Sequence, residues 1–146
     1  MLGKLLAVAA AAVALLAFAP AAMSNESAAP TLTVKSSSFG RVLFDGRGYV
    51  LYAFTRDAKG RSACYGACAK AWPVYYAKGM LRVGTGLKRS LLGTTRRRDG
   101  RLQITYAGRP LYYYVGDTKA GQIRCQNVAE FGGTWLVVRP SGRLVR

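Results

Sequence analysis

The same six-residue pattern occurs twice in this chain, sixty positions apart. It consists of Tyr, any residue, an aromatic residue, two further residues and Asp. The six motif residues are Tyr52, Phe54, Asp57, Tyr112, Tyr114 and Asp117. Each copy follows a Leu, and a Trp flanked by apolar residues comes later in each. Self-similarity at a fixed spacing is typical of a duplicated supersecondary unit, so we expect two related repeats that bury their apolar faces against each other.

Strand signals surround both copies of the motif. Segments 41–44 and 49–54 read as a hairpin around Asp45-Gly46, because Asp-Gly supplies the positive backbone angles that a tight turn needs. Segments 101–106 and 110–115 repeat this layout, and 135–139 reads as a further strand. Side chains alternate along a strand, so Tyr52 and Phe54 are expected on one face and Leu51 on the other.

These signals predict an all-β or β-rich fold of two pseudo-symmetric repeats built from antiparallel strands. The repeats, about 40–77 and 98–142, are expected to form one domain over 39–146, because about 105 residues are too few for two independent cores. Ser62 as an N-cap and Pro73 as a stop predict one short helix near 63–71. Between the repeats we expect an exposed basic connector. The cations of this expected basic surface are Lys88, Arg89, Arg96, Arg97 and Arg98.

Further motifs stand beside the doubled one in a fixed order. They are Ser62-Ala-Cys64-Tyr-Gly-Ala-Cys68 before Trp72-Pro73, Gln103-Ile-Thr-Tyr106 before Pro110-Leu-Tyr112, and Gly132-Gly133-Thr-Trp135. Together these motifs make the chain similar to the secreted-repeat family of bacterial envelope proteins, which are often lipoproteins of poorly defined function. The resemblance covers about 40–142 and implies export and a repeated β unit rather than an activity. The chain departs from the family pattern at Cys125, where a small residue is expected.

The first 23 residues read as a secretory signal peptide, with Lys4 before an apolar run from 5 to 19 and small residues after it. About 15 apolar residues are fewer than the roughly 20 that span a bilayer, so we expect no transmembrane span in the mature chain. Segment 24–38, rich in Ser, Ala and Thr, reads as a flexible leader. No Cys stands in the first sixty residues. The protein is therefore expected to be periplasmic or extracellular and not lipid-anchored.

Three cysteines in an exported chain favour a disulfide. Cys64 and Cys68 can be bridged if the backbone between them departs from a regular helix, and Gly66 adds the necessary freedom. A bridge from either of them to Cys125, and reduced thiols, are the open alternatives. If Cys125 stays unpaired, it is either buried and inert, bound to another chain, or exchanging with the other two. The spacing is not the Cys-x-x-Cys of thiol oxidoreductases.

The chain carries 22 Lys and Arg against 6 Asp and Glu, a net charge of +16, which becomes +15 when Lys4 leaves with the signal segment. Such a protein attracts polyanions, and salt weakens the attraction. Export makes nucleic acid an unlikely partner, so the expected partners are anionic envelope polymers, lipid head groups or a partner protein. The sequence holds no His and no phosphate-binding loop, which excludes imidazole-based catalysis. We therefore predict a non-enzymatic module without a cofactor or metal.

The motif carboxylates supply the alternative function. If the repeats bring Asp57 and Asp117 face to face across a cleft, the pair has the equipment of a carboxylate-based hydrolase or of a divalent-metal site. The structural interpretation is that each Asp ends its strand and accepts backbone N–H bonds from the Lys-containing segment that follows.

Overall fold

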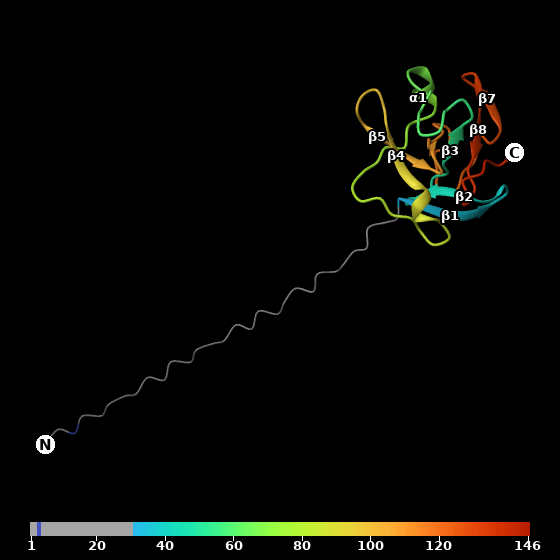
Figure 1. Ribbon diagram of the computed structural model, residues 1–146. Helices are drawn as coiled ribbons and strands as arrows, with labels where there is room; N and C mark the ends of the chain where they lie inside the picture. Colours follow the sequence, from blue (N-terminus) through green and yellow to red (C-terminus); the bar gives the residue numbers. More distant parts are fainter. Residues whose placement is uncertain (1–2, 4–30) are drawn as a thin grey trace.

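The computed structural model describes Gly3 and residues 31–146 (Figure 1). The expected signal peptide, and the expected leader up to residue 30, lie outside this part. The fold is β-rich with antiparallel sheets and two repeats, as predicted. The strands are β1 (Leu32–Ser37), β2 (Gly40–Asp45), β3 (Tyr52–Phe54), β4 (Leu92–Arg96), β5 (Leu102–Tyr106), β6 (Arg109–Pro110), β7 (Val128–Glu130) and β8 (Gly133–Val137).

Within the described part of the chain, one short α-helix, α1 (Ala67–Ala71), lies where one was predicted, and a 3-10 turn covers Arg89–Leu91. The helix begins later than expected, with Gly66 at the N-cap position instead of Ser62. The Ser62 hydroxyl instead accepts a hydrogen bond from the Cys64 amide at 3.1 Å. Across the described residues, the structure contains no helix with the length and apolarity needed to cross a membrane.

Each repeat opens with a hairpin, β1 with β2 and β4 with β5. Leu32 and Leu92, sixty positions apart, begin the two hairpins, and they lie opposite Asp45 and Tyr106, respectively. Two boundaries predicted from the sequence, those of the leader and of the connector, are therefore wrong. Strand β1 lies in the segment expected to be a flexible leader, and β4 lies in the segment expected to be an exposed connector. The physical reason is burial, because Leu32 and Leu92 both enter the core.

The motif strands pair with the Trp segment of the opposite repeat. Strand β3 pairs with β8, with Tyr52 opposite Val137. In the second repeat, the Tyr113 amide donates to the Pro73 carbonyl at 2.8 Å, and Val74 bridges to Tyr112. Figure 1 shows β8, near the end of the chain, beside β3. Each repeat therefore completes the sheet of the other.

The two motif copies also meet each other. Only the first is a regular strand, because in the second Tyr112 forms isolated bridges where a strand over 110–115 was expected. The Tyr52 amide donates to the Tyr112 carbonyl at 2.9 Å, and the Tyr112 amide donates to the Tyr52 carbonyl at the same distance. This reciprocal antiparallel pair relates the repeats by a local pseudo-twofold axis. The predicted hairpin of 41–44 with 49–54 is present as a short one. Phe44 and Val50 form an antiparallel bridge, the Asp45 amide donates to the Tyr49 carbonyl at 2.8 Å, and the Leu51 amide donates to the Leu43 carbonyl at 3.1 Å.

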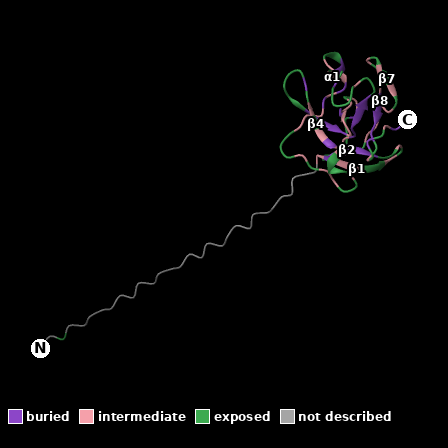
Figure 2. Ribbon diagram, in the orientation of Figure 1, coloured by how far each residue is buried: buried purple, intermediate pink, exposed green. Residues whose placement is uncertain are grey.

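The core has two faces, and the alternation predicted for the motif strand is confirmed. Tyr52 and Phe54 pack into one cluster with both tryptophans, whereas Leu51 packs into a second cluster. The rings of Trp72 and Trp135 stack in parallel, 4.0 Å apart between centroids. Figure 2 shows the buried residues gathered where the strands meet. The stacked indoles therefore link the two repeats at the centre of the molecule.

Candidate functional site

The motif tyrosines and carboxylates form crossed pairs between the repeats. The Tyr52 hydroxyl donates to Asp117 Oδ2 at 2.7 Å, and the Tyr112 hydroxyl donates to Asp57 Oδ2 at 2.7 Å. The second oxygen of each carboxylate accepts a backbone amide from its own repeat, Ala63 N at 2.7 Å and Arg124 N at 3.0 Å. Each motif Asp therefore ties its own loop to the motif Tyr of the other repeat.

Burial sets the protonation behaviour of this cluster. Desolvation raises the pKa of Asp57 to about 6, although its hydrogen bonds from Ala63 and Tyr112 oppose the shift. Desolvation also raises the pKa of Asp117. The pKa values of Tyr52 and Tyr112 also rise, mainly because both rings are buried. Both hydroxyls therefore keep their protons, as donors to a carboxylate must.

These contacts account for both motif Asp residues as structural acceptors. The donors differ from those expected, because they lie six and seven residues beyond the Asp instead of in the segment that follows it directly. A pocket of about 160 Å³ lies beside Asp57, between Lys59 and Arg109, and Asp117 does not line it. Among the residues that the structure describes, no group of three or more His, Cys, Asp or Glu side chains is placed to hold a metal ion.

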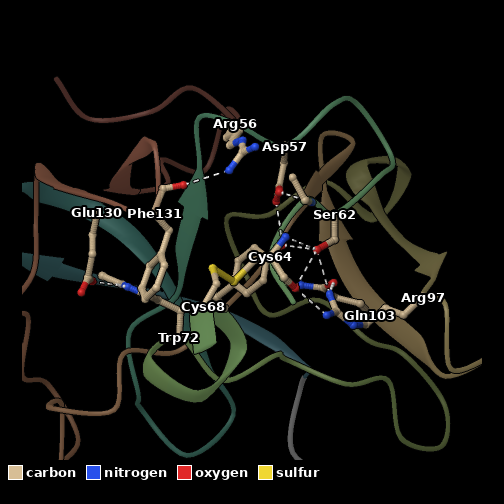
Figure 3. Close-up of a disulfide and its surroundings, with 12 residues drawn as sticks. Arg56, Asp57, Ser62, Cys64, Cys68, Trp72, Arg97, Gln103, Glu130 and Phe131 are labelled. Atoms are coloured by element: carbon tan, nitrogen blue, oxygen red, sulfur yellow. Dashed lines mark hydrogen bonds between the residues drawn. A yellow bond between two sulfur atoms is a disulfide. The ribbon is translucent and has the colours of Figure 1, made fainter. Parts of the chain in front are cut away.

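Arg97 lies inside the protein, which corrects its assignment to the basic surface. Only 5% of the residue is exposed. Its guanidinium donates to Ser62 Oγ and Gln103 Oε1, both at 2.8 Å, and to the Cys64 carbonyl at 2.6 Å (Figure 3). The reason is the turn between β4 and β5, where the Arg97 amide donates to the Arg101 carbonyl at 2.9 Å. Within a run of three arginines, composition and charge do not indicate which side chain is buried.

The remaining members of the expected basic surface, Lys88, Arg89, Arg96 and Arg98, are exposed. The Arg98 guanidinium lies 4.2 Å from the centroid of the Tyr65 ring, and that of Arg97 lies 4.1 Å from it. Arg98 therefore combines a cation–π contact with exposure, whereas Arg97 is enclosed by polar partners.

Replacement of Arg97 by Ala is expected to destabilise the fold by about 3 kcal/mol, because hydrogen bonds from a charged donor are lost and buried acceptors are left unpaired. Replacement of Arg98 by Ala should change the free energy of unfolding by no more than about 0.5 kcal/mol, as at ordinary surface positions. Urea unfolding followed by fluorescence measures both. Equal effects of the two substitutions would contradict the buried role, and Arg97→Lys should recover only part of the loss.

The disulfide between Cys64 and Cys68 is present as predicted, with Cα atoms 5.3 Å apart. Gly66, at φ 57°, gives the loop the left-handed conformation that starts α1 between the two cysteines. Cys125 is unpaired and half-buried, and it packs against the same core cluster. Burial raises the pKa of its thiol. The alternatives that joined Cys125 to Cys64 or Cys68 are therefore not what the structure shows.

A larger groove is lined by none of the six motif residues. Its volume is about 570 Å³, and the side chains that define this tyrosine groove are Tyr75, Tyr76, Tyr113, Arg47, Lys78 and Arg82. Sequence reasoning did not predict it, because its lining combines Thr31, 45–47, part of 74–82 and Tyr113, which lie far apart in the sequence and meet only in the folded chain. The available signal was the recurrence of Tyr and basic residues within 75–82.

Comparison with known proteins identifies the class of this chain. A family model described as a secreted repeat of unknown function matches residues 33–75 and 93–139. These matches cover more than half of the sequence, and the chain belongs to this secreted-repeat family. No curated protein and no solved structure matches it. The resemblance seen in the doubled motif is thus confirmed, and both matched segments begin at or next to the first strand of a repeat, β1 and β4.

Proposed function

We propose that this secreted protein is a non-enzymatic envelope module, periplasmic or extracellular and without a lipid anchor, that binds anionic cell-surface polymer through its basic exterior. A membrane of anionic lipid or an acidic partner protein presents related charge and is a competing target. The observation that carries the proposal is the imbalance of charge on the surface of the folded domain.

Residues 31–146 hold 21 Lys and Arg but only five Asp and Glu. Asp57 and Asp117 are engaged by hydroxyl and amide donors. Asp45 is 2% exposed and bound by its own turn. Within the described residues, the ion pairs are Arg47–Asp45 and Arg101–Asp99. Most cations therefore face solvent without a fixed counter-charge, and their summed field attracts polyanions.

Binding of the wild-type domain to polygalacturonate tests the proposal, measured by calorimetry at about 50 and 300 mM NaCl. We expect affinity to fall at least tenfold at the higher salt, because the screening length shortens. Reversing Lys88, Arg89, Arg96 and Arg98 to Glu should weaken binding at low salt by a similar factor. Arg97 is left intact, since it stabilises the fold.

The matched control replaces Lys88 by Arg and replaces Arg89, Arg96 and Arg98 by Lys. These changes keep the charge and should keep the affinity within about twofold. Absence of binding by the wild-type domain at low salt, or binding insensitive to both salt and charge reversal, would overturn the proposal.

A further inference from the structure

The tyrosine groove has the dimensions of a ligand site. At about 570 Å³ it exceeds the pocket beside Asp57, about 160 Å³, and the pocket between Tyr65 and Cys68, about 360 Å³. Small-molecule sites commonly occupy 300 to 1,000 Å³. The groove is therefore large enough for one or two sugar units.

The single acid in the groove is neutralised within the protein. Asp45 Oδ1 accepts the amides of Arg47 and Tyr49, each at 2.9 Å. Asp45 Oδ2 accepts Arg47 Nε at 3.0 Å and the Tyr113 hydroxyl at 2.9 Å. The Arg47 guanidinium is one of these four donors, so the charge of the buried carboxylate is compensated by Arg47.

The cations of the groove are available to a ligand. The Arg47 side chain is 71% exposed, and its Asp45 contact uses only Nε. Lys78 and Arg82 are exposed, and within the described residues neither forms an ion pair with a carboxylate. Three cationic groups and one carboxylate thus line the groove, and their net charge of +2 favours an anion over a neutral or cationic ligand.

Two of the three tyrosines in the groove use their hydroxyls within the protein, so what they offer a ligand is ring carbon. The Tyr75 hydroxyl donates to the Thr31 carbonyl at 2.6 Å, and the Tyr113 hydroxyl is held by Asp45. The two rings meet edge to face with centroids 5.2 Å apart. Met80, 76% exposed, adds an apolar side chain to the lining. Ring carbons and a thioether suit the C–H face of a sugar better than a bare phosphate.

We propose that the tyrosine groove binds an anionic sugar unit of a glycopolymer, with the phosphate or carboxylate held by Arg47, Lys78 and Arg82 and the carbon face packed on Tyr75 and Tyr113. This inference rests on the proposed function and gives it a site and a ligand class. The concave shape favours a polymer unit over a flat membrane, and binding to vesicles is one outcome of the test.

The test uses ¹⁵N-labelled domain titrated at 50 mM NaCl with trigalacturonate, with mannopentaose phosphate and with neutral mannopentaose. Trigalacturonate carries carboxylates and mannopentaose phosphate carries a phosphate, so the two ligands show which anionic group the groove binds. Binding of either one supports an anionic sugar as the ligand. Amide shifts are expected at 45–47 and 75–82. The variant K78E/R82E should bind at least tenfold more weakly. The control R143E/R146E carries the same charge change at exposed positions that line none of the three pockets, and it should lose at most threefold.

Each outcome separates the two proposals. Equal weakening by both variants, or shifts confined to 88–98, would overturn the groove site and leave the proposed function standing. Failure of the wild-type domain to bind any polyanion would overturn both. Binding to vesicles with 30% phosphatidylglycerol that depends on Lys78 and Arg82, without binding to the charged oligosaccharides, would overturn the glycopolymer assignment. Unchanged thermal unfolding shows that the variants are folded.

Discussion

A fragment that ends at Gly79 is expected to stay unfolded on its own, and so is the fragment that begins at Met80. In the first, β3 loses its partner β8. In the second, the strand around Tyr113 loses the Pro73 carbonyl that its amide contacts. Each fragment also keeps only one of the two stacked indoles, and loss of a buried Trp side chain alone costs about 3 to 5 kcal/mol. Since a whole domain is stable by only about 5 to 15 kcal/mol, neither half retains a folded state.

Circular dichroism and amide NMR spectra of residues 31–79 and 80–146 measure this directly. An equimolar mixture should recover the near-ultraviolet signal of the intact domain, because the halves contain complementary strands. The control is a full-length chain cleaved after folding at a protease site inserted after Gly79, which should retain the native spectrum. Cooperative unfolding of either isolated fragment would show that the strand exchange is dispensable.

The crossed Tyr–Asp pairs are expected to couple across the repeats and not within them. A double-mutant cycle with Tyr52→Phe and Asp117→Ala should give an interaction free energy of about 1.5 to 3 kcal/mol, the range for hydrogen bonds to charged groups. Tyr112→Phe with Asp57→Ala should give a similar value. Each single change leaves a buried partner unsatisfied, and the double change removes both groups.

Within-repeat cycles provide the matched control, because they use the same four substitutions in the other combinations. Tyr52 with Asp57, and Tyr112 with Asp117, share no hydrogen bond in the structure, so their coupling should stay within about 0.5 kcal/mol. Urea unfolding of the single and double variants supplies every value. If only the within-repeat pairs were coupled, the motif Asp would stabilise the turn of its own repeat and would not join the two repeats.

The features that depend on residues close together in the sequence were predicted correctly. The alternation of Tyr52 and Leu51 between two cores follows from strand geometry alone. The Cys64–Cys68 disulfide follows from spacing and export. Periodicity tells which face a side chain occupies, but not which strand lies beside it, and for that reason the exchange of β8 between the repeats was missed.

Two other features were also missed, strand β1 and the crossed Tyr–Asp pairs, and both depend on contacts between segments that are distant in the sequence. The strand β1 is a short run of small polar residues around Leu32 and Val34, and composition alone read it as a leader. The sixty-residue spacing that relates the motif copies also relates Leu32 to Leu92, so the repeat itself carried the signal. The sequence of one copy does not show that its Asp binds the Tyr of the other copy, because each copy contains both a Tyr and an Asp.

The crossed pairs also define what one copy of the repeat lacks. Its Tyr hydroxyl has no carboxylate of its own, and its Trp segment has no motif strand of its own to lie against. In a chain that holds a single copy, only a second molecule can provide both, through an interface that uses the same surface on each partner. The two copies in this chain supply each other with both, as the two subunits of a twofold dimer would.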